Sequence, residues 1–320
     1  MSPSERVEFI AVALLGAPGL GTGKLREVLD QLRRKELTPA NFLKLDDKTL
    51  SSHFGLGRRA VDALRHPESN AVAAWEALER QGVRVAVLGY SGYPERLARM
   101  LRASAPPVLF MRGNPDLAMK AAVGFCGSRA ASAKGLTVAS DCARSLAREG
   151  VNVVSGYARG VDLAAHRAAL EVGGTTTMVL AEGISHFRIK GELRDVMDED
   201  LSRVLVISEF PPGLPWRAHN AMARNRTICG LANAMVVIES GAEGGTFEAG
   251  RTALELGEPL FCVEYAEATP SAAGNPYFLQ RGALGLRRAK SGEPNLTQLL
   301  SVIRTDYGSR DGRSQRELSF

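Results

Sequence analysis

Short apolar runs alternate with helix-length segments along the second half of the chain, and this alternation limits the fold more than any other feature. The runs occupy residues 121–127, 151–156, 175–183, 203–209, 234–240 and 259–263. Segments of helical character lie between several of them, near residues 134–149, 160–172 and 246–257. Strands that are apolar throughout are buried on both faces, as happens when helices cover both sides of a parallel sheet. The pattern predicts a doubly wound, mostly parallel α/β sheet.

The expected body is Rossmann-like in the broad sense and covers residues 121–304 of a chain of 320. Residues 1–82 carry apolar side chains at three- and four-residue spacing, which predicts a small all-helical N-terminal domain. Residues 83–120 contain two short apolar runs and a short helical segment, and we expect them to connect to the sheet and extend it. The polar residues 305–320 are expected to form a flexible tail.

Composition excludes several classes of protein. Hydrophobic residues make up 45% of the chain and charged residues 23%, as in globular proteins. No stretch approaches the roughly 18 uninterrupted apolar residues of a membrane helix, so we expect a cytoplasmic protein without a membrane partner. The four cysteines form no C-x-x-C pair, which argues against a zinc site or a disulfide framework. No metal or other cofactor is predicted.

The net charge of +5 arises in the first third of the chain. Residues 1–112 hold 17 Lys and Arg against 12 Asp and Glu, whereas the two kinds are balanced in the rest. Such a bias is compatible with a nucleic-acid partner, but many soluble enzymes share it. Charge alone therefore does not identify what the protein binds.

Glycine, serine and arginine follow the first two predicted strands of the body. Gly127, Ser128 and Arg129 follow the first, and residues 155–160 follow the second. Ligands of such sheets bind beyond the carboxyl ends of the strands, where small residues let the backbone approach an anion and arginine can fork onto a phosphate. No G-x-G-x-x-G follows the first strand, so a bound dinucleotide is not expected. We predict a phosphate-binding crest at this edge.

Five motifs in fixed order carry a family resemblance: GSR at 127–129, SGYARGVDLAAH at 155–166, SEFPPG at 208–213, RNRTICGL at 224–231 and GNPYFLQRGA at 274–283. In order and spacing they resemble the DNA-processing protein A family, also called Smf, and the similarity covers roughly residues 8 to 285. The resemblance implies a non-enzymatic homodimer that binds single-stranded DNA, protects it, and loads the RecA recombinase in transformation and recombination.

The resemblance also implies a set of DNA-contacting residues. Arg129 matches a phosphate-contacting arginine, Lys190 takes the place of a second basic contact, and Phe187 matches an aromatic position at which a base could stack. Phe187 could equally belong to the core, and Lys190 could be an ordinary solvated lysine. The predicted nucleic-acid-binding residues are Gly127, Ser128, Arg129, Ser155, Gly156, Arg159, Phe187, Lys190, Arg224, Asn225 and Arg226.

The role of residues 224–226 stays open at this stage. We expect Arg224, Asn225 and Arg226 to open the helix that leads into the strand at 234–240. The two arginines could instead pair with acidic neighbours and hold the fold together. His166, on the helix predicted at 160–172, is expected to serve packing or capping rather than catalysis.

A rival function comes from the sequence GGTFE at 244–248. It resembles part of the P-G-G-x-G-T-x-x-E stretch of lysine-decarboxylase-like phosphoribohydrolases, although Ala249 stands where their glutamate would be. In this interpretation Gly244, Gly245, Thr246 and Glu248 bind a nucleotide, and the protein is a nucleotide sensor or a phosphoribohydrolase. Carboxylates near the strand ends, at Glu182, Glu209 and Glu239, favour a ribose over a chain of phosphates.

The N-terminal domain carries a weaker signal. Gly19-Leu20-Gly21 and Gly55-Leu56-Gly57 resemble the turns of helix-hairpin-helix domains, which hold a DNA backbone on exposed amides. Each glycine could instead simply end a helix.

Overall fold

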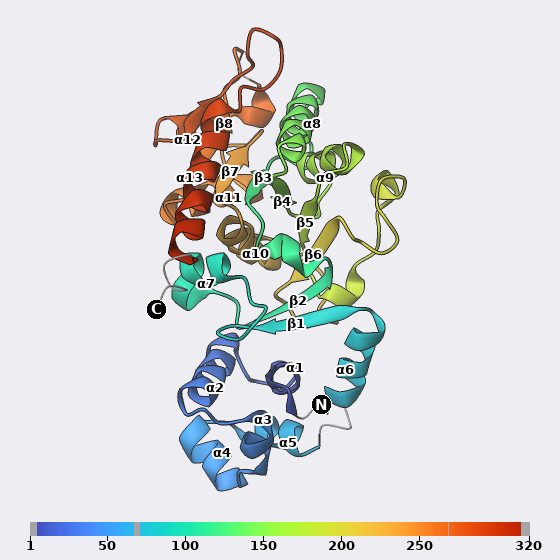
Figure 1. The fold of residues 1–320 in the computed structure, drawn as a ribbon, viewed down its shortest axis with the longest axis vertical. Coiled ribbons are helices and arrows are strands. Elements are labelled where there is room, and N and C mark those ends of the chain that lie inside the picture. The colour runs from blue at the N-terminus through green and yellow to red at the C-terminus, as the bar shows by residue number, and fades with distance from the viewer. Residues whose placement is uncertain (1–4, 67–70, 268, 315–320) are drawn as a thin grey trace.

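The computed structural model describes residues 5–66, 71–267 and 269–314, with side chains described as far as residue 305. A bundle of short helices lies at one end and a large mixed sheet with its covering helices fills the rest (Figure 1). Among the described residues, no helix combines the length and the apolar character needed to cross a membrane.

Nine strands of the described chain form one sheet in the order β1-β2-β6-β5-β4-β3-β7-β8-β9. The strands from β6 to β9 in this order are parallel. Strands β1 and β2 pair with each other in antiparallel fashion, and β2 joins β6, also antiparallel. The predicted Rossmann-like, mostly parallel fold is confirmed. The strands are β1 Val83–Val87, β2 Val108–Gly113, β3 Ala122–Cys126, β4 Asn152–Ser155, β5 Thr176–Val179, β6 Val204–Ser208, β7 Ala234–Val237, β8 Leu260–Val263 and β9 Leu284–Leu286.

Helices cover both faces of the sheet because alternate side chains of each buried strand point to opposite sides. In β3, Val123 and Phe125 pack against one layer of helices, whereas Ala122 and Cys126 pack against the other. The first layer holds α8 Ala133–Arg148, α9 Val161–Glu171 and α13 Thr297–Ser314, and the second holds α7 Glu95–Leu101, α10 Ala218–Leu231, α11 Gly245–Glu255 and α12 Asn275–Leu279.

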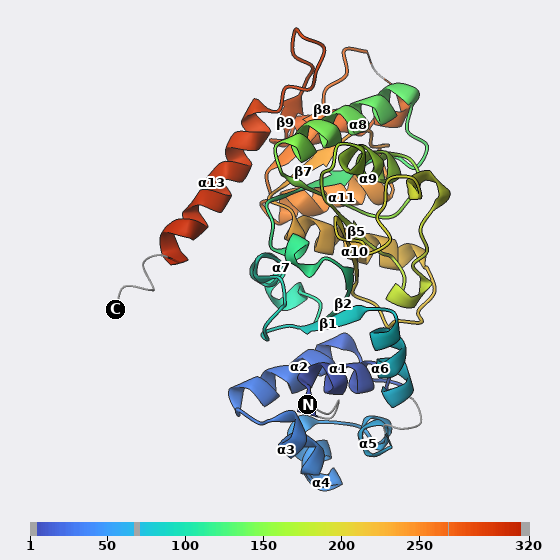
Figure 2. The ribbon, with the colours of Figure 1, turned by 45° about the vertical axis from the view of Figure 1, so that its right-hand side comes forward.

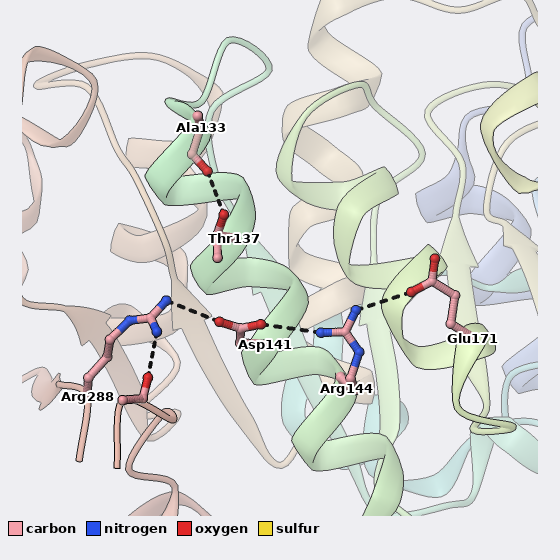
Figure 3. A network of polar contacts seen from close by, with 7 residues as sticks. Ala133, Thr137, Asp141, Arg144, Glu171 and Arg288 are labelled. Carbon is pink, nitrogen blue, oxygen red and sulfur yellow. Dashed lines mark hydrogen bonds and ion pairs between the residues drawn. The ribbon is translucent and has the colours of Figure 1, made fainter. Parts of the chain in front are cut away.

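An ion-pair network runs across the outer surface of α8 (Figure 3). Asp141 pairs with Arg288 at 3.1 Å and with Arg144 at 3.3 Å, and Arg144 reaches Glu171 of α9 at 3.2 Å. These side chains are partly exposed, so each pair stabilises the fold only modestly. The network fixes α8 laterally between α9 and the segment that follows β9.

The N-terminal helices pack on the edge of the sheet that β1 and β2 form (Figures 1 and 2). Their core includes Leu14 and Leu25, and it continues without a break through Val83 and Val108 to Val206 of the sheet. Gly55 ends α4 in the left-handed conformation, with φ of 63°, and its amide bonds to Leu50. The helices are α1 Val7–Leu15, α2 Thr22–Arg34, α3 Pro39–Lys44, α4 Asp47–Phe54, α5 Arg58–Arg65 and α6 Ala71–Arg80.

Two helices differ from the sequence prediction. Helix α10 begins at Ala218, so residues 224–226 lie in its middle rather than at its start. Its first turns lie at the solvent-facing crest and lack the apolar periodicity that marks a packed helix. Residues 305–314, where a flexible tail is expected, continue α13, which leans away from the body (Figure 2). Residues 315–320 lie outside the described residues.

One buried ion pair ties the connecting segment to the body. Arg96 of α7 donates to both carboxylate oxygens of Glu258, at 2.8 and 2.7 Å, and its Nε donates to the carbonyl of Ala232. The two side chains are only 8% and 1% exposed. A charge in such a place is tolerated because its partner is there, so removing either one leaves the other uncompensated.

We therefore predict that Glu258→Ala lowers the free energy of unfolding by about 3–5 kcal/mol, because it leaves the Arg96 guanidinium buried without its counter-charge. Urea denaturation measures this value. The matched control is Glu255→Ala, which breaks an exposed pair with Arg251 and should cost less than about 1 kcal/mol. Equal losses in the two variants would contradict the assignment.

Candidate functional site

Two neighbouring cavities open at the carboxyl edge of the parallel strands. The first, here called the basic cavity, has a volume of about 470 Å³ and is lined by Arg129, Tyr157, Ala158, Arg159, Leu180, Ala181, Glu182, His186, Arg188, Lys190, Trp216 and Arg224. The second, here called the glycine cavity, has about 530 Å³, and its lining includes Gly127, Ser128, Asp162, Met222, Asn225, Gly241, Glu243, Gly245 and Thr246. Arg129, Ala158, Trp216 and Arg224 line both cavities.

The structure brings Arg129 and Lys190 into the same cavity. Arg129 follows β3 and is exposed, and its guanidinium lies over the ring of Trp216 at 5.5 Å from the ring centre. The loop beneath it is tight: Gly160 has φ of 78°, and a Cβ there would come within 2.4 Å of the carbonyl oxygen of Ser128. Glycine at position 160 therefore lets the loop after β4 close against the loop that carries Arg129.

Lys190 is held on a tyrosine. Its ammonium donates to the carbonyl of Tyr157 and lies 4.4 Å from the centre of that ring, while its backbone amide donates to the Tyr157 hydroxyl at 2.9 Å. Half-burial lowers the pKa of Lys190, chiefly through desolvation of the ammonium. The lysine is thus placed before any ligand arrives, and it is not a freely solvated side chain.

The predicted stacking role of Phe187 is wrong. Its side chain is 3% exposed and packs against Tyr157, with the two ring centres 5.5 Å apart. The Arg112 guanidinium lies 6.0 Å from the centre of the Phe187 ring. It belongs to the core that the helical bundle shares with the sheet. A base cannot reach its faces, so Phe187 supports Tyr157 from below.

Arg224 lies under the crest and forms a buried pair with Asp162 at 3.5 Å, both side chains being about one-tenth exposed. Asp162 also accepts from the Ser155 hydroxyl at 2.9 Å and from the Ala158 amide at 3.1 Å. A Cβ on Gly156 would fall 1.9 Å from the Arg224 guanidinium, so only glycine fits there. Burial lowers the pKa of Arg224, and its Nε finds no hydrogen-bond partner among the described residues.

The loop amides expected to face a ligand are occupied or buried. The Ser128 amide donates to the carbonyl of Glu239 at 2.9 Å. Ser155 is fully buried at the end of β4, and Gly156 is buried beneath the Arg224 guanidinium. The Ser128 amide is therefore already paired and Ser155 and Gly156 lie beneath the surface, whereas Ser128 itself lines the glycine cavity.

Neighbouring residues of α10 face different ways. Asn225 is buried, and its amide donates to the carbonyl of Gly245 at 3.1 Å, which fixes the start of α11 beside the glycine cavity. Arg226 is exposed but lines neither cavity. The structure therefore joins Arg224 and Asn225 to the site and leaves Arg226 outside it.

The residues of the rival interpretation are only partly brought together. Gly245 and Thr246 line the glycine cavity at the start of α11, and Gly244, with φ of 96°, caps that helix. Glu248 instead pairs with Arg251 at 3.4 Å on the outer side of the helix and does not line the cavity. The carboxylate of Glu248, which the rival interpretation assigns to nucleotide binding, is therefore absent from the lining of the glycine cavity.

Two of the other crest carboxylates are used by the fold. Glu239 is fully buried and accepts from the amide of Ser132, at 2.8 Å, and from its hydroxyl, at the start of α8. Glu209 accepts from the Thr227 hydroxyl, and burial raises its pKa. Glu182 remains as the carboxylate among the lining residues of the basic cavity.

The basic cavity thus holds five cations against one carboxylate in its lining. Apart from Arg224, none of these cations forms an ion pair with a carboxylate within the described ranges. No group of three His, Cys, Asp or Glu side chains in the same ranges is arranged to hold a metal ion. The arrangement suits a ligand with several negative charges.

Sequence reasoning missed three residues of this cavity. Tyr157 anchors Lys190, Arg188 adds a cation, and Trp216 stands exposed between the two cavities. Trp216 lies in the segment PPGLPWRAH, which has no helical or strand periodicity. The sequence gives no signal of its exposure, because an irregular segment can also place an aromatic side chain in the core, as it does for Phe187.

Comparison with known proteins identifies the family of this chain. The family model described as DNA recombination-mediator protein A matches residues 84–292, which is more than half of the chain. The chain belongs to the DNA recombination-mediator protein A family. The family shown by the match is the one that the five sequence motifs indicated.

Curated relatives are similar over most of this chain. The Smf protein of Escherichia coli is 29% identical over 227 residues, covering 71% of this chain and 60% of that protein. A DNA processing protein DprA of Mycobacterium tuberculosis, described as putative there, is 31% identical over 274 residues, covering 82% and 66% respectively. This chain therefore spans less than two thirds of the length of these relatives.

Two solved structures share the fold. DNA processing protein A from Streptococcus pneumoniae superposes with a TM-score of 0.71 and 26% identity, covering 89% of this chain and 94% of that one. A Helicobacter pylori structure, described as showing the single-stranded DNA binding mode of DNA processing protein A, gives a TM-score of 0.56 at 22% identity over 71% of this chain and 97% of that one. The second likeness shows the fold alone.

His166 supports the crest from inside and generates a pH prediction. Its Nε2 lies 2.6 Å from the carbonyl oxygen of Gly156 and its Nδ1 lies 2.6 Å from the Thr176 hydroxyl. Complete burial lowers the pKa of His166 below its ordinary value. The unfolded chain therefore binds a proton at this residue more readily than the native protein does, and acid favours unfolding.

We predict that stability is insensitive to His166 above its unfolded pKa of about 6.5 and falls as the pH drops below that value. One such group contributes a slope of at most about 1.4 kcal/mol per pH unit. Urea denaturation between neutral pH and pH 5 measures the slope, which should be flatter in His166→Gln, whatever the absolute stability of that variant. The control is His186→Gln at an exposed position, and identical slopes in His166→Gln and the parent protein would contradict the prediction.

Proposed function

We propose that this protein binds single-stranded DNA along the basic cavity, through electrostatic contacts with the phosphates. The observation that supports this most strongly is the placement of Arg129 and Lys190 in one cavity together with Arg159 and Arg188. Apart from Glu182, no acidic residue belongs to the lining of that cavity. A strand of phosphates supplies the negative charge that these groups lack, and such contacts are independent of base sequence.

The charges are arranged rather than merely abundant. Lys190 is fixed on Tyr157, Arg129 is stacked on Trp216, and Arg224 is fixed by Asp162. Side chains that are already ordered lose less conformational freedom when a ligand binds. Binding of a polyanion in this cavity therefore costs less conformational entropy than binding to the same cations on flexible, solvated side chains.

Related proteins support the choice of ligand. The Helicobacter pylori DNA processing protein A is described with a single-stranded DNA binding mode, and it has the same fold. The family itself is described as a recombination mediator. By extension, the protein protects single-stranded DNA, loads RecA onto it as a homodimer, and catalyses no reaction of its own. We expect this work to take place in the cytoplasm, where the DNA lies.

A second candidate is a nucleotide ligand in the glycine cavity. Gly245 and Thr246 present the start of α11, which has no side-chain cap, to this cavity. A helix start of this kind favours a phosphate group. Glu248 pairs with Arg251 away from the cavity, so it is not placed to assist hydrolysis of a bound nucleotide. A nucleotide sensor therefore fits this cavity better than a phosphoribohydrolase.

We predict that Arg129→Ala and Lys190→Gln each weaken binding of a labelled oligothymidine and of mixed-sequence strands alike. Each variant removes one phosphate contact, so the slope of log K against log salt becomes shallower by about 0.7. Lys190→Gln removes the charge and keeps an uncharged N–H donor on a slightly shorter side chain. Fluorescence anisotropy over a salt titration measures both the affinity and the slope.

The matched control is Arg304→Ala. It removes an exposed cation of α13 that pairs with Glu149 at the end of α8. It should leave affinity and slope unchanged. Unchanged slopes in both cavity variants would contradict the proposal. Thermal stabilisation of the protein by one nucleoside monophosphate, together with no oligonucleotide binding, would instead support the nucleotide candidate.

A further inference from the structure

Two large apolar side chains, Trp216 and Met222, are exposed at the crest. Among the described residues, three large hydrophobic side chains are markedly exposed: Met119 at 42%, Trp216 at 49% and Met222 at 49%. Two of the three, Trp216 and Met222, line the glycine cavity. Exposed apolar groups that cluster in a cavity mark a surface that another molecule covers.

The position of Trp216 relates this apolar surface to the cations. Trp216 lines both cavities, and the Arg129 guanidinium lies 5.5 Å from its ring centre. About half of the residue nevertheless remains exposed. A phosphate held by Arg129 therefore brings the base of the same or the next nucleotide beside the indole.

We propose that Trp216, with Met222 beside it, is the surface on which a base of the bound strand stacks. This inference rests on the proposed function and assigns the aromatic contact that buried Phe187 cannot make. Indole rings stack on every base through its π face, so the contact adds affinity without sequence preference. In a duplex those faces are already covered by neighbouring base pairs. Trp216 is therefore the residue that makes the site prefer unpaired strands.

The cations argue for a base rather than a protein partner on this surface. The apolar side chains adjoin a cavity with five cationic residues in its lining. A nucleic acid strand alternates negative phosphates with apolar ring faces, and the crest presents the complement of both at neighbouring points. An apolar protein partner would bury these cations against a surface that does not neutralise them.

Intrinsic fluorescence tests the inference directly, because the chain has two tryptophans. Trp75 is 5% exposed and packs edge-to-face on Phe9 in the N-terminal bundle. In a Trp75→Phe variant, all indole emission comes from Trp216. We expect oligothymidine to quench this emission, and we expect an abasic phosphodiester strand of equal length to bind without quenching it.

Affinity measurements on Trp216 variants separate stacking from charge. Trp216→Ala should lower the affinity for oligothymidine about fivefold or more, which is the loss of one stacked base. It should lower the affinity for the abasic strand by a smaller factor, because the Arg129 guanidinium also loses the ring that it lies over. Trp216→Phe should restore most of the loss, since it retains an aromatic face. The matched control is Met119→Ala, which removes an exposed apolar side chain that lines neither cavity and should change nothing.

The outcomes distinguish this inference from the proposed function. Salt-dependent binding of oligothymidine with unchanged Trp216 emission and unchanged affinity in Trp216→Ala overturns the stacking role and leaves the DNA-binding proposal intact. Equal quenching by the abasic strand also overturns it, because the indole would then report only the movement of Arg129. Failure of the parent protein to bind either strand would contradict both the stacking role of Trp216 and the proposed binding of single-stranded DNA.

Discussion

The buried guanidinium of Arg224 organises the crest on which the rest of the site depends. It lies over Gly156 at the end of β4, pairs with Asp162 at the start of α9, and projects from the middle of α10. One side chain of α10 thus fixes the loop between β4 and α9, which is distant from α10 in the sequence. Arg224 also lines both cavities. The positive charge that holds the loops together therefore also adds to the positive electrostatic potential in the cavities.

The crest becomes cationic because the fold uses most of its carboxylates elsewhere. Glu239 accepts hydrogen bonds at the start of α8, Glu209 accepts one from Thr227, and Glu248 faces Arg251. None of these three carboxylates belongs to the lining of the basic cavity. In the sequence these carboxylates suggested a nucleotide-binding protein. In the structure they do not repel phosphates from the basic cavity, because they are bound to other groups of the fold.

Periodicity along the chain was enough to predict the mostly parallel sheet and its Rossmann-like fold, but not where α10 begins. It was not enough to predict which side chains point outward. Phe187 and Trp216 are both aromatic residues in irregular segments, yet one is 3% exposed and the other 49%. Spacing gives a position along the chain, whereas exposure depends on contacts between distant segments, such as that of Phe187 with Tyr157. For the same reason Arg224 and Arg226, two residues apart, have different roles.

Ultraviolet cross-linking of the full chain to oligothymidine, followed by peptide mapping, tests most directly whether the crest is the DNA site. Cross-links form only where a base touches the protein. The account predicts that they fall in the segments that line the two cavities, near residues 157–159 and 216–224, and that unlabelled oligonucleotide competes for them. Cross-links concentrated in the N-terminal helices or along α13, with the crest peptides unmodified, would contradict it.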